Sequence, residues 1–392
     1  MMKSVITYTL DSCRKCLKCL KFCPTGAITL DNGRVFISDE KCINCGKCVE
    51  ACHNQGIQAK GSTLIDIKNY DYTVCIVPSS LIGHCKTRQE VEEMFYAIKE
   101  LGFDEVVDMT DIEGQIHDEV RKYSLYSNNA CNISSFCPVV NKLIQVKYPM
   151  LLQNIIPINY PSEVAAKRIR KIHKDKENLG IFNCCECESK LSLAKYPYGN
   201  TSYEVDHALS IVDIFPLIRA NMGKGRLKLS LCKEGLQSCN PYMMLVDEND
   251  LVADGFEKII NVLEHAEFGL LKDFKLLELF PCFNGCIGGR LLWGSSYLIK
   301  SNFFALIDGD EKRISNISFD ELYNDKITKE VKDDRTIQEK LQFFAKVNAK
   351  LDKLPGYDCT ACGLPSCRVM AEEIVNGNKT LSDCKILVRK EV

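Results

Sequence analysis

Several features that indicate common classes of function are missing from this sequence. Lysine and arginine (50) nearly balance aspartate and glutamate (52), and neither half is markedly basic, so nucleic acid and anionic membrane surfaces are not expected partners. No apolar run approaches the roughly 20 residues of a membrane helix, and the first residues lack the apolar segment of a secretory signal. The six histidines are scattered, and none is assigned as a metal ligand. We therefore expect a cytoplasmic protein without membrane insertion.

Cysteine, in contrast, is abundant, with 23 residues in a chain of 392. A disulfide framework is not expected, because the chain is large, its cysteine count is odd and many cysteines stand in short CxxC runs. Iron–sulfur ligation explains such runs better, and zinc is the alternative for any single CxxC pair. The length allows two or three domains, which we place at residues 1–60, 61–330 and 331–392.

Residues 1–60 contain the spacing C-x2-C-x2-C-x3-C twice. In bacterial two-cluster ferredoxins the fourth cysteine of each run ligates the other cluster. We therefore assign one 4Fe–4S cluster to Cys13, Cys16, Cys19 and Cys52, and a second one to Cys42, Cys45, Cys48 and Cys23. Between the two runs, residues 27–30 and 34–37 predict a hairpin. The pattern indicates a ferredoxin-like module that carries electrons.

Residues 61–330 predict an α/β body with parallel sheets. Residues 72–77 form a β-branched run typical of a buried strand, and residues 105–108 predict a second strand. The apolar residues of 87–101 fall on one face of a helix between them, so the unit is βαβ. A further apolar run at 179–182 precedes a cysteine-rich segment. Loops that follow such strands are where α/β folds place their chemistry.

Three segments of this body carry cysteines in a suggestive order: 134–138 (SSFCP), 183–190 (NCCECESK) and 278–289 (ELFPCFNGCIGG). The third segment is rich in glycine and nearly uncharged, and glycine lets the backbone close around inorganic sulfide. Alone, each segment is better explained by buried structural thiols. The remaining cysteines of the body lie in no motif and are expected to be buried thiols, namely Cys75, Cys85, Cys131, Cys232 and Cys239.

Taken together, the three segments resemble the signatures of the iron-only (di-iron) hydrogenase large subunit, T-S-C-C-P-x-W, M-P-C-x-x-K and E-x-M-x-C-x-x-x-C-x-x-G-G-G. The order and the rough spacing agree, and a ferredoxin module precedes the segments here as well. The resemblance implies that a central 4Fe–4S cluster is held by Cys137, Cys187, Cys282 and Cys286. It also implies that Cys286 bridges to a di-iron subsite bearing carbon monoxide and cyanide.

Two assignments within the second segment stay open. Cys187 fits best because it preserves the C-x-x-K spacing, and Cys184 and Cys185 are the alternatives. By the same resemblance Lys190 contacts a cyanide ligand of the di-iron subsite, a role that suits a buried ammonium. The alternative for Lys190 is an ordinary surface lysine.

Several positions depart from the family pattern. Phe136 replaces the cysteine that donates protons to the di-iron site in the family, so fast hydrogen turnover by the usual route is not expected. Glu186 replaces a proline and Arg290 replaces the third glycine, which changes the walls of the site. These differences resemble the divergent branch of the family to which sensing is attributed. Members of that branch also combine a ferredoxin module with a C-terminal cluster domain.

Residues 331–392 predict a linker helix followed by another cluster. Apolar residues from Ile337 to Leu351 recur at helical spacing, which favours packing. A small helical 4Fe–4S domain is then indicated by Cys359, Cys362, Cys367 and Cys384, with a helix over 368–376 that returns the last cysteine to the others. The spacing resembles the 4Fe–4S domain of corrinoid iron–sulfur proteins, and a zinc knuckle is the alternative.

The combined interpretation is an iron–sulfur redox protein of an anaerobic system. The resemblance implies that it senses or slowly converts H2 and passes electrons through its 4Fe–4S clusters. Its expected partners are H2 or protons and a redox protein, such as a ferredoxin or a signalling protein. Two alternatives stay open. One is a non-enzymatic relay whose central site holds only a 4Fe–4S cluster, and the other is an iron–sulfur assembly factor.

Overall fold

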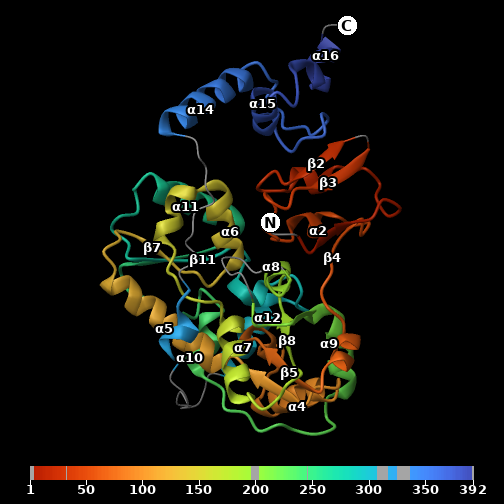
Figure 1. Cartoon of the computed structure of the whole chain (residues 1–392), viewed down its shortest axis with the longest axis vertical. Coiled ribbons are helices and arrows are strands. Elements are labelled where there is room, and N and C mark those ends of the chain that lie inside the picture. The colour runs from red at the N-terminus through yellow and green to blue at the C-terminus, as the bar shows by residue number, and fades with distance from the viewer. Residues whose placement is uncertain are drawn as a thin grey trace. The chain divides into compact units, whose positions relative to one another are not determined.

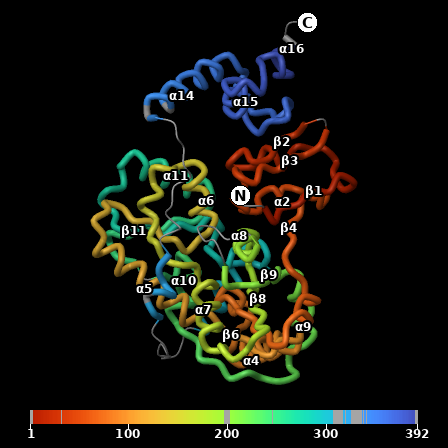
Figure 2. The backbone as a smooth tube through the Cα atoms, in the orientation of Figure 1, coloured from red at the N-terminus to blue at the C-terminus, as the bar shows by residue number. Residues whose placement is uncertain are grey.

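A computed structural model describes residues 4–31, 33–195, 203–244, 246–306, 317–324 and 336–390 of the chain. The contacts within it divide the chain into two compact units. The first unit combines residues 1–60 with residues 331–392, and the second comprises residues 61–330. Figure 1 shows the elements and Figure 2 shows the path of the backbone. Each unit is described by itself.

The N-terminal part of the first unit consists of two antiparallel strand pairs. β1 (Ile6–Tyr8) pairs with β4 (Ile57–Ala59). β2 (Ile28–Asp31) pairs with β3 (Arg34–Ile37), which confirms the predicted hairpin. Two short helices, α1 (Lys18–Lys21) and α2 (Lys47–Ala51), each carry the third cysteine of a C-x2-C-x2-C run.

The C-terminal part of the first unit is helical, as predicted. Its elements are α14 (Ile337–Leu351), α15 (Cys367–Val375), the 3-10 turn η5 (Leu381–Asp383) and α16 (Lys385–Lys390). A small core that includes Val347 and Met370 joins α14 to α15. The predicted apolar stripe of α14 is only partly packed, because Leu341 and Phe344 remain exposed.

The first sheet of the second unit confirms the predicted parallel topology. Its strand order is β6 (Glu105–Asp108), β5 (Tyr72–Val77), β8 (Leu179–Cys185) and β9 (His207–Ser210), with every pair parallel. The predicted helix α4 (Arg88–Lys99) connects β5 to β6. The strand expected over 179–182 continues to Cys185, so Cys184 and Cys185 belong to the strand rather than to the loop.

A second parallel sheet has the order β10 (Asp250–Asp254), β11 (Leu276–Phe280) and β7 (Asn132–Ile133). The helix α11 (Phe256–Glu267) connects β10 to β11. The other helices of this unit are α3 (Ser79–Ile82), α5 (Thr110–Tyr126), α6 (Pro138–Lys147), α7 (Pro161–Ile172), α8 (Glu188–Leu193), α9 (Ile211–Asn221), α10 (Lys233–Ser238), α12 (Ser296–Leu306) and α13 (Phe319–Leu322). Short 3-10 turns are η1 (Leu64–Asn69), η2 (Pro149–Asn154) and η3 (Gly285–Gly288).

The first sheet is buried on both faces, as its continuous apolar strands require. Successive residues of β5 point to opposite sides, so Val77 joins one apolar core and Ile76 joins the other. The core on the side of Val77 contains residues of α4 and α9, and the core on the side of Ile76 contains residues of α5 and α7 (Figure 1). Because helices cover both faces of the sheet, the loops come together at the ends of the strands.

In the part of the chain that the structure describes, no helix has both the length and the apolar composition that crossing a bilayer requires.

Candidate functional site

The first predicted cysteine set of the N-terminal part surrounds one hollow. Cys13, Cys16, Cys19 and Cys52 all line it, together with apolar residues such as Leu30 and Val35. Cys52 reaches this hollow because β1 and β4 are paired, which brings the chain after Cys52 back to Cys13. At Gly56 the two segments are so close that a Cβ would lie 3.2 Å from the Cα of Cys13.

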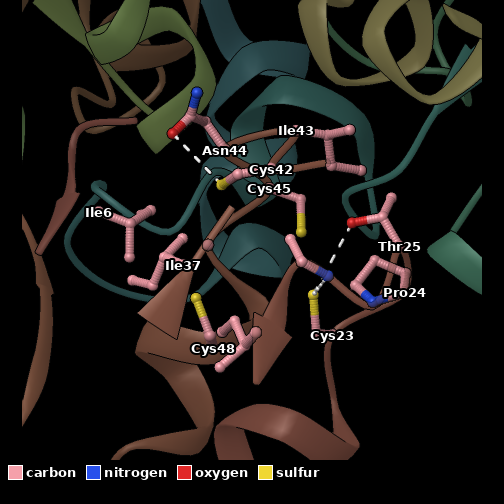
Figure 3. A pocket seen from close by; sticks show the side chains of 13 residues that line it. Ile6, Cys23, Pro24, Thr25, Ile37, Cys42, Ile43, Asn44, Cys45 and Cys48 are labelled. Carbon is pink, nitrogen blue, oxygen red and sulfur yellow. Dashed lines mark hydrogen bonds between the residues drawn. The ribbon is translucent and has the colours of Figure 1, made fainter. Parts of the chain in front are cut away.

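The second set surrounds a separate hollow, which Figure 3 shows. Its cysteines are Cys23, Cys42, Cys45 and Cys48. Donors for sulfur are already in place here, because the N–H of Ala27 donates to Cys23 Sγ at 3.2 Å. The hydroxyl of Ser4 also lies 3.3 Å from Cys42 Sγ, but it donates its proton to Asn44 Oδ1 at 2.7 Å. The structure thus separates the eight cysteines as the crossed ligand assignment proposes.

The third set lies in the C-terminal part, where Cys359, Cys362, Cys367 and Cys384 line one hollow. The helix α15 begins at Cys367 and is followed by Gly377 with a φ of +80°. This left-handed residue reverses the chain and allows Cys384 to return to the other three cysteines. The side chain of Asp358 accepts a hydrogen bond from the N–H of Cys367 at 2.6 Å and fixes the loop.

Left-handed backbone conformations are concentrated in the cysteine loops. Among the described residues, the non-glycine residues with positive φ are Lys15, Leu17, Asn44, Gln55, Asn284, Asp358 and Thr360. All of them lie within a few residues of a cysteine that we assign as a cluster ligand. Such conformations are costly for residues with a Cβ, and they turn successive N–H groups toward one concave surface that binds anions and Fe–S sites. The loops are therefore shaped to hold anionic sulfur.

The cysteines of each of these three sets surround a hollow, which is the arrangement that a cluster requires. Among the described residues, no three or more histidine, cysteine, aspartate or glutamate side chains converge closely enough to hold one metal ion. The cysteines of each set nevertheless line a common hollow. Burial raises the pKa of Cys19 to about 11, so this thiol loses its proton when a metal binds. The donor set fits 4Fe–4S clusters.

The second unit brings its three cysteine segments to the ends of parallel strands. Cys137 follows β7 and is the N-cap of α6, and Cys187 follows β8 and is the N-cap of α8. Cys282 follows β11, and Cys286 lies in η3. β7 and β11 belong to one parallel sheet and end at the same edge of it, whereas β8 belongs to the other sheet, so this site draws on strand ends of both sheets.

The four thiols of this central site are near one another. Burial raises the pKa of Cys282, and the nearby Cys137 raises it further. Burial also raises the pKa of Cys187, and the neighbouring Glu186 and Cys282 add to this effect. Burial also raises the pKa of Cys286; the nearby Lys190 opposes this increase, and Glu186, Cys239 and Cys137 add to it.

The two alternative cysteines of the second segment point elsewhere. Cys184 Sγ lies 3.5 Å from Cys75 Sγ inside an apolar core. Cys185 Sγ interacts with Asn183, its neighbour along the strand, and is fully buried. Of the three candidates, Cys187 lies after the strand, at the N-terminus of α8. This geometry favours Cys187 as the ligand.

Lys190 is buried and faces the central site. Its Nζ lies 3.9 Å from Cys286 Sγ and 5.3 Å from the centre of the Phe136 ring. It also forms an ion pair with the buried carboxylate of Glu186. Burial by itself lowers the pKa of Lys190, but Cys286 and Glu186 outweigh burial and raise it well above its ordinary value. An ammonium is thus held beside the sulfur of Cys286, so a surface position for Lys190 is excluded.

The charged residues that depart from the family pattern are compensated in pairs. Glu186 is paired with Lys190, and Arg290 Nε donates to the buried carboxylate of Glu188 at 3.0 Å. Charges buried in this way cost much less than isolated charges. The sequence pattern revealed the substitutions at Glu186 and Arg290 but not their partners, because the Arg290–Glu188 pair spans 102 positions.

Two further residues near the site were not found from the sequence. Glu113 of α5 is buried and accepts a hydrogen bond from the N–H of Ser79 at 3.3 Å. Burial raises its pKa to about 8, although the nearby Lys190 partly offsets the increase. Cys239 accepts a hydrogen bond from the N–H of Cys286 through its carbonyl at 2.8 Å and positions η3. Neither residue stands in a motif, so only the fold reveals them.

Three family models match separate parts of the chain. Residues 5–53 match the model of a 4Fe-4S dicluster domain. Residues 72–234 match the model of the iron only hydrogenase large subunit, C-terminal domain. Residues 354–386 match a model for an Fe-S cluster domain. The hydrogenase match includes Cys137, Cys187 and Lys190, whereas Cys282 and Cys286 lie beyond it.

Curated relatives match short stretches of the chain. The Electron transport protein HydN of Escherichia coli K12 is 43% identical over 54 residues, which cover 13% of this chain and 31% of that protein. The polyferredoxin-like subunit of the aliphatic sulfonate oxidoreductase of Pyrococcus furiosus is 50% identical over 36 residues, which cover 9% of this chain and 21% of that protein. The chain thus spans about a third or less of the curated relatives that it matches.

Solved FeFe-hydrogenase structures are similar to this chain at low identity. A variant of HydA1 from Chlamydomonas reinhardtii is 16% identical with a TM-score of 0.47, and the match covers 67% of this chain and 91% of that one. The form HydA(deltaEFG) is 17% identical with a TM-score of 0.47, and the match again covers 67% and 91%.

Proposed function

Since the chain is a divergent iron-only hydrogenase-like protein with a ferredoxin module and a C-terminal Fe–S domain, we propose that it senses H2 or converts it slowly. Its 4Fe–4S clusters then pass electrons to or from a redox partner, a ferredoxin or a signalling protein. The observation that carries the proposal is the buried ammonium of Lys190, 3.9 Å from Cys286 Sγ.

The residues of the central site have distinct roles in this proposal. Cys137, Cys187, Cys282 and Cys286 hold a 4Fe–4S cluster, and a di-iron subsite bound next to it supplies the place where H2 reacts. Lys190 holds an anionic ligand of that subsite by charge. Phe136 is buried against Lys190 and excludes water, but it has no proton to give. A site that lacks a positioned proton donor works slowly.

An infrared spectrum tests the proposal directly. The protein is purified without oxygen after co-expression with hydrogenase maturation enzymes. We expect bands of metal-bound carbon monoxide and cyanide, and we expect Cys286→Ser to lose these bands together with any H2-dependent reduction of the other clusters. A spectrum without such bands, or unchanged reduction by H2 in Cys286→Ser, contradicts the proposal.

The missing proton donor offers a second test. Phe136→Cys restores a thiol where the resemblance implies one, and a general acid in position contributes about 10²-fold or more to a rate. We expect H2 turnover to rise by about that factor in Phe136→Cys. Phe136→Leu is the matched control, because it shortens the side chain without adding a proton. Equal rates in both variants would show that proton donation at this position does not limit turnover.

A relay without hydrogen chemistry is the second candidate. It is favoured by the ion pair of Lys190 with Glu186, because the ammonium then already has a buried anionic partner. The contact of Lys190 with the Phe136 ring also fills space beside the site. In this case iron and sulfide analysis gives about four cubanes per chain while the infrared spectrum shows no diatomic ligands. Cluster transfer to an apo-protein would instead support the assembly factor.

A further inference from the structure

The C-terminal Fe–S domain is docked on the hairpin of the ferredoxin module through glycines. The N–H of Leu30 in β2 donates to the carbonyl of Gly363 at 2.8 Å. A Cβ on Gly363 would lie 2.3 Å from the carbonyl oxygen of Leu30, so only glycine allows this approach. At Gly26 a Cβ would lie 3.2 Å from a methyl carbon of Val369 in α15.

This contact joins two of the cysteine hollows. Leu30 lines the hollow of Cys13, Cys16, Cys19 and Cys52. Gly363 stands between Cys362 and Leu364, which both line the hollow of the C-terminal domain. A single backbone hydrogen bond therefore connects a residue that lines the first hollow with the neighbour of a ligand in the third.

Two other contacts between the hairpin and the C-terminal domain are less specific. The ion pair between Lys41 and Glu373 has a separation of 4.0 Å, and the Lys41 side chain is about half exposed. Exposed pairs of this kind contribute at most about 1 kcal/mol. Near Gly26, whose neighbours Thr25 and Ala27 line the second hollow, the facing groups are the apolar side chains of Val369 and Pro365. The hydrogen bond at Gly363 is thus the more specific connection.

We propose that this contact is an internal electron-transfer interface between the C-terminal cluster and the cluster of Cys13, Cys16, Cys19 and Cys52. One electron crosses at a time, so one cluster is oxidised by one electron as the other is reduced by one, and no bond or proton is exchanged. A one-electron donor or acceptor protein supplies or removes this electron at Cys359, which is exposed. The inference rests on the electron-transfer role alone and is independent of hydrogen chemistry.

The test uses the full chain with its clusters, reduced with dithionite and studied by electron paramagnetic resonance. Two reduced clusters at this interface split and broaden each other's signals. All variants carry Cys45→Ser, which removes the second N-terminal cluster and with it the coupling between the two N-terminal clusters. We expect the remaining coupling in this background and its loss when Gly363→Ala is added, because the added Cβ meets Leu30. The matched control is Gly377→Ala, which has a similar φ of +80° but nothing within 4 Å of the added Cβ. It should keep the coupling.

Iron and sulfide content show whether each variant retains its clusters. If Gly363→Ala loses iron, Val369→Glu decides, because it places a charge against Gly26 and replaces neither a ligand nor a loop residue. In the same background, Cys16→Ser removes a ligand of the proposed partner cluster and should abolish the coupling. The proposal is overturned if Cys45→Ser by itself shows no coupling, or if coupling persists when Val369→Glu or Cys16→Ser is added. Infrared bands are unaffected by these outcomes, so the hydrogen proposal stands or falls separately.

Discussion

The two units of the molecule place their cysteines in very different surroundings. In the first unit the cysteines line hollows beside small cores, such as the group that contains Val347 and Met370. In the second unit they follow strand ends of two sheets, and two large apolar cores contain residues of β5, β8 and β11. Small domains depend on metals for stability, whereas a large core folds without them. We infer that the first unit needs its clusters to stay folded, whereas the second unit stays folded without its cluster.

Removal of iron should give the largest contrast between the units. With a chelator under reducing conditions, we expect amides of β2 and β3 to exchange at rates near those of an unfolded chain, since their stability is metal-binding energy. Amides of β5 and β8 should keep their protection because their strands lie in the apolar cores. Hydrogen exchange followed by mass spectrometry measures both in one sample. Equal loss of protection in the two units would break the comparison.

Single ligand replacements should show the same contrast on a smaller scale. Cys48→Ser removes a buried ligand of the second cluster, and we expect the hairpin of β2 and β3 to lose protection together with that cluster. Cys282→Ser should lose the central cluster and leave β5 and β8 protected. Iron content and hydrogen exchange of the two variants, compared side by side, check this. Unfolding of the body in Cys282→Ser would contradict it.

The body should instead depend on pH through a buried acid. Glu163 of α7 is buried, and burial raises its pKa from 4.5 to about 7, although a hydrogen bond from the N–H of Glu204 opposes the shift. Between pH 4.5 and about 7 the folded protein keeps this proton, whereas the unfolded chain releases it. The free energy of unfolding is therefore highest at low pH and falls as the pH rises toward 7. The full shift corresponds to about 3 kcal/mol.

Glu163→Gln mimics the protonated acid. Between pH 5 and pH 8, its free energy of unfolding should therefore fall by about 2–3 kcal/mol less than that of the unmodified chain. Unfolding of the body by denaturant at the two pH values measures the effect. Glu257→Gln in α11 is the control, because Glu257 is exposed. An equal pH dependence in the unmodified chain and in Glu163→Gln would show that this acid does not limit the body.

The smallest effect is expected at a hydroxyl that can donate to a ligand sulfur. The Thr25 hydroxyl lies 3.8 Å from Cys23 Sγ, and a donor near a ligand sulfur favours the reduced, more negative cluster. Thr25→Val should lower the potential of the second cluster by an amount on the order of tens of millivolts. Ser38→Ala is the control, since the Ser38 hydroxyl accepts from the N–H of Lys41 instead. A redox titration in which both variants match the unmodified chain would remove Thr25 from this role.

Local patterns were sufficient for much of the fold. The hairpin of β2 and β3, the strands β5 and β6 and the helix α4 depend on side-chain periodicity and turn residues within short segments. The sheet of β10, β11 and β7 was not located from the sequence. β7 has only two residues, and its pairing joins positions 132–133 to 276–277, so no local signal indicates it.

For the cysteine sites, too, local patterns predict one part and the tertiary structure decides the other. Cysteine spacing within a run is a local property, because a short loop can place three sulfurs around one cluster whatever the rest of the chain does. The sequence alone was therefore enough to propose the ligands of the two N-terminal clusters and of the C-terminal cluster. The neighbours of those ligands depend on contacts between distant segments. Examples are the ion pair of Arg290 with Glu188 and the hydrogen bond of Leu30 to Gly363. Such contacts arise only when the packing of the cores brings strand ends and loops together, which is why folding, and not spacing, sets the surroundings of each cluster.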